Sequence, residues 1–103
     1  MKEIFEKQKK FQKFIGNDIN SQKFRNEMLY AIIAEVVEAG NETTWKSWKK
    51  TQEFNKNKFV EELADVQIFL INLVISSGIS WKEFQNEIEK KIKINFKRQE
   101  NEY

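Results

Sequence analysis

Apolar side chains recur every three or four positions along almost the whole chain, which is the spacing of one face of an α-helix. Gly16 and Gly78 suit helix ends, and Ser80 with Glu83 three residues later forms a capping box at a helix start. The pattern predicts four helices, over about residues 2–15, 20–40, 57–77 and from 81 towards the C-terminus. We therefore expect an all-α fold, a compact four-helix bundle formed by one domain over residues 1–103.

Two acidic pairs interrupt these apolar stripes. Glu35 and Glu38 lie near the end of the second predicted helix, and Glu62 and Asp65 lie near the start of the third. A spacing of three residues points both carboxylates of a pair the same way. A helical hairpin would bring the pairs together, because both lie close to the connection between the helices.

Four clustered carboxylates repel one another unless a positive charge lies between them, and a divalent metal is the obvious candidate. The alternative is two ordinary solvated helix faces, on which glutamates three residues apart are common. That alternative is weakened here, because both pairs continue apolar stripes on consecutive helices.

Composition narrows the chemistry. The 103 residues include no cysteine and no histidine, which excludes disulfides, zinc fingers and every Ser-His or Cys-His catalytic scheme. Oxygen ligands alone favour a hard cation, Mg²⁺ or Mn²⁺, over Zn²⁺. A net charge of +2 does not by itself indicate a polyanion-binding protein.

The sequence also indicates where in the cell the protein is expected to be found. We expect no signal peptide and no membrane span, since the apolar run of residues 66–75 is too short and interrupted. The absence of cysteine fits a cytoplasmic protein.

The connector after the first acidic pair interleaves aromatic and basic residues, as Trp45-Lys46-Ser47-Trp48-Lys49-Lys50. One interpretation is a rim that holds Lys46 and Lys49 against phosphates. The alternatives are tryptophans that fill a gap in the core, or a surface that binds single-stranded nucleic acid.

The last helix ends in a basic tail. Lys91, Asn95 and Arg98 are spaced four and three residues apart and therefore share one face. Phosphate capture is the functional interpretation, and a solvated terminal helix face is the alternative.

Polar residues also lie on the apolar stripes. Gln8 lies on the stripe of the first predicted helix, and Asn72 lies on the stripe of the third. We expect the buried side of the third helix to include Leu63. An amide presents a hydrogen-bond donor and an acceptor together, so Gln8 and Asn72 are weak candidates for recognition of a base. The alternative is a position at the edge of the core or a buried hydrogen bond.

Taken together, these motifs resemble the all-α NTP pyrophosphatases, most closely the dimeric dUTPases and next the MazG-type enzymes. Glu-x-x-Glu, Trp-Lys-x-Trp-Lys and Glu-x-x-Asp follow one another as in that family, over about residues 27–75, and residues 91–99 resemble its late Lys-Asn-x-x-Asn-x-x-Arg-Gln element. Two departures concern base specificity: the chain is shorter than usual for a dimeric dUTPase, and Ile92 replaces the second asparagine of the late element.

The resemblance implies Mg²⁺-dependent hydrolysis of a nucleoside triphosphate, with dUTP converted to dUMP and pyrophosphate. It implies metal ligation by the four carboxylates, of which Glu35 and Glu38 are also the catalytic candidates that orient water. It further implies phosphate contacts by Lys46, Lys49, Lys91, Asn95 and Arg98. A homodimer or a higher homo-oligomer is the expected assembly.

Three alternatives stay open at this point. The first is a MazG-like hydrolase of other nucleotides such as dCTP. The second is a non-enzymatic helical protein that binds nucleic acid through its tryptophans and basic tail, and this option leaves the four carboxylates unexplained. The third is a catalytically silent helical interaction module with the same fold.

Overall fold

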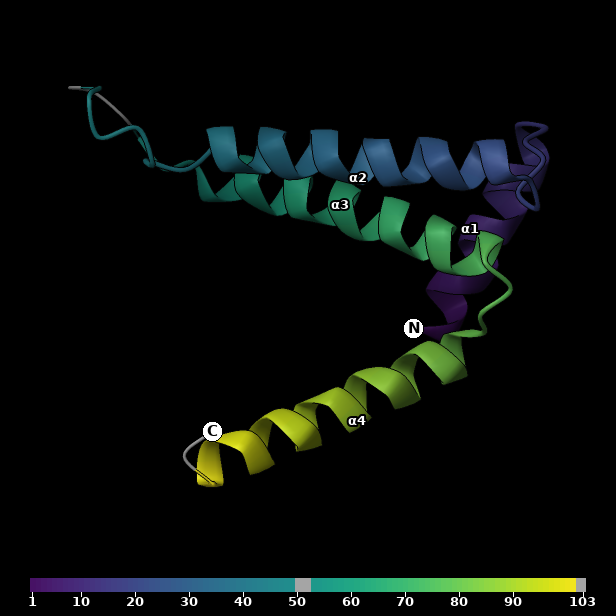
Figure 1. Ribbon diagram of the computed structural model, residues 1–103. Helices are drawn as coiled ribbons and strands as arrows, with labels where there is room; N and C mark the ends of the chain where they lie inside the picture. Colours follow the sequence, from purple (N-terminus) through teal and green to yellow (C-terminus); the bar gives the residue numbers. More distant parts are fainter. Residues whose placement is uncertain (50–52, 102–103) are drawn as a thin grey trace.

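The structure is a computed structural model that describes residues 1–49 and 53–101. Over these residues it consists of four α-helices without a strand (Figure 1), which confirms the all-α, four-helix prediction. The helices are α1 (Lys2–Phe14), α2 (Gln22–Asn41), α3 (Lys56–Ser76) and α4 (Trp81–Glu100).

Local capping explains where the helices begin. The side chains of Ser21, Asn55 and Ser80 accept hydrogen bonds from backbone N–H groups three residues later, at the starts of α2, α3 and α4. The hydroxyl of Ser80 also donates to Glu83 Oε1 at 3.2 Å. Each cap satisfies a backbone donor that has no partner within the helix.

Two helices end on glycines with left-handed backbone conformation. Gly16 follows α1 with a φ of 78°, and Gly78 follows α3 with a φ of 74°. After α3, the N–H groups of Gly78 and Ile79 donate to the carbonyls of Ile75 and Val74. This double closure is the Schellman motif, which directs the chain sharply away from the helix axis.

Helices α2 and α3 run antiparallel along most of their length and form a hairpin (Figure 1). Arg25 links the far end of this hairpin, because its guanidinium donates to the carbonyl of Ser76 at 3.0 Å. The bond uses a carbonyl of the last turn of α3, which has no acceptor role within the helix.

A small apolar cluster joins α1, α3 and α4. Phe5 and Ile71 are each 1% exposed and Val74 is 5% exposed. Around them pack four partly buried side chains: Leu70, Ile75, Trp81 and Phe84. The cluster therefore fixes the first turns of α4 against the C-terminal end of α3.

Beyond that cluster α4 diverges from the hairpin (Figure 1), and α3 and α4 are bent by 113° relative to each other. The radius of gyration is 17.1 Å, whereas a typical globular chain of this length has about 13 Å. Of the described helices, none is long and apolar enough to cross a membrane by itself; α3 and α4 pass that test only as this bent pair.

The divergence leaves apolar side chains in contact with solvent. The prediction that Leu63 is buried is wrong, since its side chain is 47% exposed. Leu63 lies on the same side of α3 as Val74, eleven residues later, but α1 and α4 cover that side only near Val74.

Candidate metal and nucleotide site

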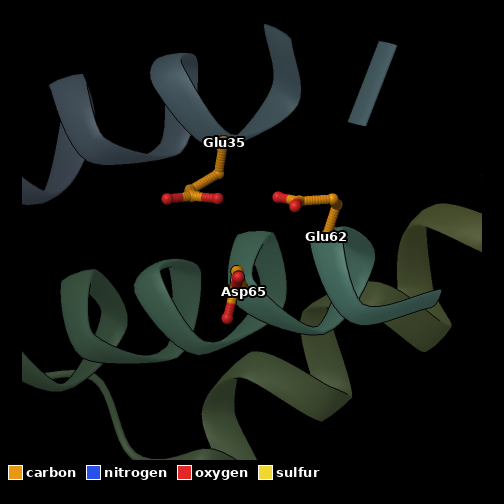
Figure 2. Close-up of side chains that lie close together, drawn as sticks. All are labelled: Glu35, Glu62 and Asp65. Carbon is orange, nitrogen blue, oxygen red and sulfur yellow. The ribbon is translucent and has the colours of Figure 1, made fainter. Parts of the chain in front are cut away.

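The hairpin places the two acidic pairs opposite each other. Glu35 comes from the last half of α2, and Glu62 and Asp65 come from the first half of α3. Figure 2 shows Glu35 reaching from α2 towards α3 and Glu62 reaching back towards α2, with Asp65 on the next turn of α3. The predicted hairpin thus brings carboxylates from both pairs into one cluster.

The cluster is tight. One carboxylate oxygen from each of Glu35, Glu62 and Asp65 lies within 4.8 Å of the others. Glu35 and Glu62 are half-buried, whereas Asp65 is exposed. Three oxygen ligands from two helices, open to solvent on one side, make a suitable donor set for a hard divalent cation that keeps several waters.

Two carboxylate oxygens of the clustered residues lack protein partners. Glu35 Oε2 and Glu62 Oε2 are buried and receive no hydrogen bond. A buried acceptor without a partner destabilises the fold, and it does so more strongly when it is charged. The donor set therefore fits a cation, which would satisfy both oxygens.

The crowding also perturbs protonation. Burial raises the pKa of Glu62 to about 7, and the neighbouring carboxylates of Glu35 and Glu38 act in the same direction. Burial and the charge of Glu38 also raise the pKa of Glu35. Without a cation, Glu62 is therefore partly protonated at neutral pH.

Glu38 stands outside the tight group. It is exposed, one turn after Glu35 on α2, and it belongs to no trio of closely spaced ligand atoms among the described residues. Its charge nevertheless acts on both half-buried glutamates. Glu38 is thus a carboxylate at the solvent side of the cluster.

The connector after α2 carries the aromatic and basic residues. The rings of Trp45 and Trp48 meet edge to face at 5.5 Å between centroids, and Lys46 Nζ lies 5.6 Å from the centre of the Trp45 ring. Both tryptophans are exposed, so they do not fill a gap in the core. Lys49 is exposed as well, and Lys50 lies outside the described residues.

A cavity of about 310 Å³ opens beside this connector. Its lining comes from the end of α2 and the residues that follow it: Val37, Gly40, Asn41, Thr43 and Trp45. Thr43 closes the end of α2 by donating its hydroxyl hydrogen to the carbonyl of Gly40 at 2.7 Å. The cavity is thus formed by local chain geometry at the mouth of the hairpin.

The structure does not bring the basic tail to the carboxylates of the same chain. Lys91, Asn95 and Arg98 lie on the second half of α4, the part that diverges from α3 (Figure 1). Lys91 and Asn95 are exposed there.

The two amide candidates are in the interior. Asn72 is 2% exposed, and its Oδ1 has no hydrogen-bond partner. Gln8 is half-buried, and its buried Oε1 has no hydrogen-bond partner either. Ser76 Oγ is also buried and unpartnered, four residues after Asn72. Sequence reasoning missed Ser76, although its spacing from Asn72 places both on one side of α3.

The chain was also compared with known proteins. A family model described as dUTPase matches residues 1–99. No curated protein and no solved structure gives a significant match. The match covers all four helices almost completely and includes both acidic pairs.

Proposed function

The chain belongs to the dUTPase family whose model spans residues 1–99, and on that premise we propose that it hydrolyses a nucleoside triphosphate to the monophosphate and pyrophosphate with a divalent cation. The preferred substrate is dUTP. The observation that carries the proposal is the cluster of Glu35, Glu62 and Asp65, with ligand oxygens within 4.8 Å and two buried oxygens lacking partners.

The cation is Mg²⁺, with Mn²⁺ as a substitute, because only oxygen ligands converge here. Glu35, Glu62 and Asp65 would hold it, with Glu38 as the outer carboxylate. When bound, such a cation neutralises charge on the phosphate oxygens and orients the substrate.

Hydrolysis to dUMP requires water to attack the α-phosphorus, so that a P–O bond forms and the bond to the bridging oxygen of the β-phosphate breaks. The attacking water must lose a proton. Glu35 and Glu38 are the proposed catalytic residues that orient this water and accept its proton, since they lie on α2 beside the cluster. The leaving group is pyrophosphate.

The phosphates need positive partners. Lys46 and Lys49 lie on the connector that follows α2 and would contact the triphosphate from there, beside the paired rings of Trp45 and Trp48. Lys91, Asn95 and Arg98 are the further phosphate-binding candidates.

The base would be recognised by amides. Gln8 Oε1 and Asn72 Oδ1 are buried acceptors without partners, and the N3–H group of uracil is a donor that either oxygen can accept. Asn72 also follows Asp65 by two helical turns on the same side of α3. A MazG-like preference for another nucleotide such as dCTP is the competing specificity.

A substrate panel tests the proposal. Purified protein is incubated with Mg²⁺ and each of dUTP, dCTP, dTTP, dATP, dGTP, UTP and ATP, and pyrophosphate release is measured. We expect release from dUTP above all others. Release that is fastest from dCTP overturns the base assignment, and no release from any nucleotide overturns the enzymatic assignment.

A further inference from the structure

Among the described residues, three buried side-chain oxygens outside the carboxylate cluster have no hydrogen-bond partner. They are Gln8 Oε1, Asn72 Oδ1 and Ser76 Oγ. Asn72 is 2% exposed and Ser76 is 4% exposed, so bulk solvent does not reach these two side chains. Because buried polar atoms of folded proteins are almost always hydrogen-bonded, the three oxygens call for a partner.

The small core places these side chains at the contact between two helices. Phe5 of α1 packs with Ile71 of α3. Gln8 follows Phe5 by less than one helical turn, and Asn72 directly follows Ile71. Asn72 and Ser76 are four residues apart, which puts their Cβ atoms about 5–6 Å from each other on one side of α3. The three oxygens therefore border one small region between α1 and α3.

The hydroxyl of Ser76 differs from that of the serine after it. Ser77 is exposed, and its hydroxyl donates to the carbonyl of Leu73, four residues earlier, at 2.8 Å. Ser76 makes no such bond, although its backbone is fixed by Arg25, which donates to the Ser76 carbonyl at 3.0 Å. The Ser76 hydroxyl is therefore available for a partner in the interior.

The numbers of donors and acceptors identify this partner. An amide oxygen only accepts hydrogen bonds, whereas a hydroxyl also has one hydrogen to donate. One water molecule matches the set, since it accepts the hydroxyl hydrogen of Ser76 and donates one hydrogen to each amide oxygen. Buried waters typically make about three hydrogen bonds to groups that otherwise lack partners. A single water thus satisfies all three oxygens.

We propose that Ser76, through one buried water, fixes the orientation of the Asn72 amide and thereby determines which pyrimidine base the site accepts. When Ser76 donates to the water, both hydrogens of the water go to acceptors. Asn72 then has to turn Oδ1, and not its NH2 group, towards the water. Ser76 is a positioning residue, because it acts on the base only through Asn72. This step rests on the proposed function, in which Asn72 is a candidate for base recognition.

The orientation of the amide decides between uracil and cytosine. Oδ1 has two acceptor positions, so it can accept from the water and from a base together. In the fixed orientation Oδ1 accepts from N3–H of uracil, and the NH2 group donates to O4. Cytosine carries an acceptor at N3 and a donor at N4, so each of these atoms meets a group of its own kind. The rotated amide would match cytosine instead.

The hydroxyl of Ser76 is what excludes the rotated amide. In Ser76→Ala the water receives no hydrogen from residue 76, so it can accept one from the NH2 group of Asn72. Both orientations of the amide are then hydrogen-bonded, and the site can adapt to either base. The substitution should therefore strengthen binding of cytosine nucleotides and change the binding of uracil nucleotides little.

A high-resolution crystal structure of the full chain tests the water directly and without using activity. We expect an ordered water within hydrogen-bond distance of Gln8 Oε1, Asn72 Oδ1 and Ser76 Oγ. A direct hydrogen bond between Ser76 and Asn72, or no ordered water at these atoms, overturns the proposal.

Isothermal titration calorimetry with dUMP and dCMP tests the effect on base recognition. The preference for dUMP should fall about tenfold in Ser76→Ala, through tighter binding of dCMP. Ser77→Ala, which removes the neighbouring exposed hydroxyl, is the matched control and should leave the preference unchanged. Circular dichroism checks that both variants stay folded. An unchanged preference in Ser76→Ala, or an equal loss of affinity for both nucleotides, overturns the proposal.

Failure of the proposed function gives a different result, because the titrations need no hydrolysis. A wild type that prefers dUMP but releases no pyrophosphate from any triphosphate rejects the enzymatic assignment and leaves the result for Ser76 standing. A wild type that hydrolyses dUTP, with a base preference that Ser76→Ala does not alter, supports the enzymatic assignment and overturns the role of Ser76.

Discussion

Glu35 and Glu62 face each other across the α2–α3 hairpin, and each keeps one buried carboxylate oxygen without a hydrogen-bond partner. Their carboxylates lie with that of Asp65 within 4.8 Å. Two like charges at this separation oppose folding of the hairpin. Protonation of Glu62 or binding of a cation would relieve this repulsion.

Replacing Glu62 by glutamine should stabilise the protein in the absence of divalent cations. The amide keeps the shape of the side chain and removes one charge from the cluster. We expect a higher Tm without Mg²⁺ and loss of the increase that Mg²⁺ causes in the wild type. Differential scanning calorimetry with EDTA and with Mg²⁺ measures both effects.

Glu61→Gln is the matched control, because Glu61 is the exposed neighbour and carries the same charge. It should leave the Mg²⁺-induced shift in place. A wild-type Tm that Mg²⁺ never changes would argue against metal binding at this cluster.

Stability should fall as the pH rises through neutrality when no divalent cation is present. The pKa of Glu62 is raised to about 7 in the folded protein, above its ordinary value near 4.5. Between these values the folded state binds more protons than the unfolded state, so the free energy of unfolding decreases with pH. We expect the Tm to decrease from about pH 5.5 to about pH 8.

The variant Glu62→Gln should show a weaker dependence of Tm on pH, because it lacks the carboxylate that takes up the proton. Saturating Mg²⁺ should weaken the dependence as well, because the cation replaces the proton in the cluster. An equal slope in the wild type and in Glu62→Gln would assign the pH dependence to other groups.

Much of this site was predictable from the sequence. The helix starts at Ser21 and Ser80 follow from side-chain capping. Glu35 lies near the C-terminal end of α2 and Glu62 near the N-terminal end of α3, so a hairpin places them opposite each other. The late basic element was also recognisable on α4. These features depend on local spacing, which the sequence displays directly.

The position of α4 was not predictable in the same way. The periodicity identifies Ile88, Ile92 and Phe96 as one stripe, but a stripe does not say what covers it. The direction of α4 depends on the Schellman turn at Gly78 and on Trp81 and Phe84 packing near Phe5. The contact of Arg25 with the Ser76 carbonyl likewise spans 51 residues and has no local signal.

The small core at the vertex should be the most sensitive part of the fold. Phe5→Ala removes a ring that is 1% exposed, and truncations of this kind cost about 3–5 kcal/mol. Phe14→Ala on the same helix is the control, since Phe14 is 86% exposed. We expect thermal unfolding to show a large loss of Tm only for Phe5→Ala, and equal losses would contradict the assigned core.

Lys49 should contribute to substrate binding. It is exposed on the connector that follows α2. Loss of one charge-assisted contact of about 1.5 kcal/mol raises KM roughly tenfold. We expect this increase for Lys49→Ala in steady-state kinetics, with little change for Lys58→Ala on the exposed side of α3. An unchanged KM for Lys49→Ala would remove Lys49 from the phosphate site.

The most direct test of the carboxylate cluster is Mg²⁺-dependent release of pyrophosphate from dUTP, measured side by side for the wild type, Glu62→Gln and Glu61→Gln. We expect stoichiometric dUMP and pyrophosphate from the wild type and from Glu61→Gln, and a loss of at least about a hundredfold in kcat/KM for Glu62→Gln. Activity of Glu62→Gln equal to that of Glu61→Gln would contradict this expectation.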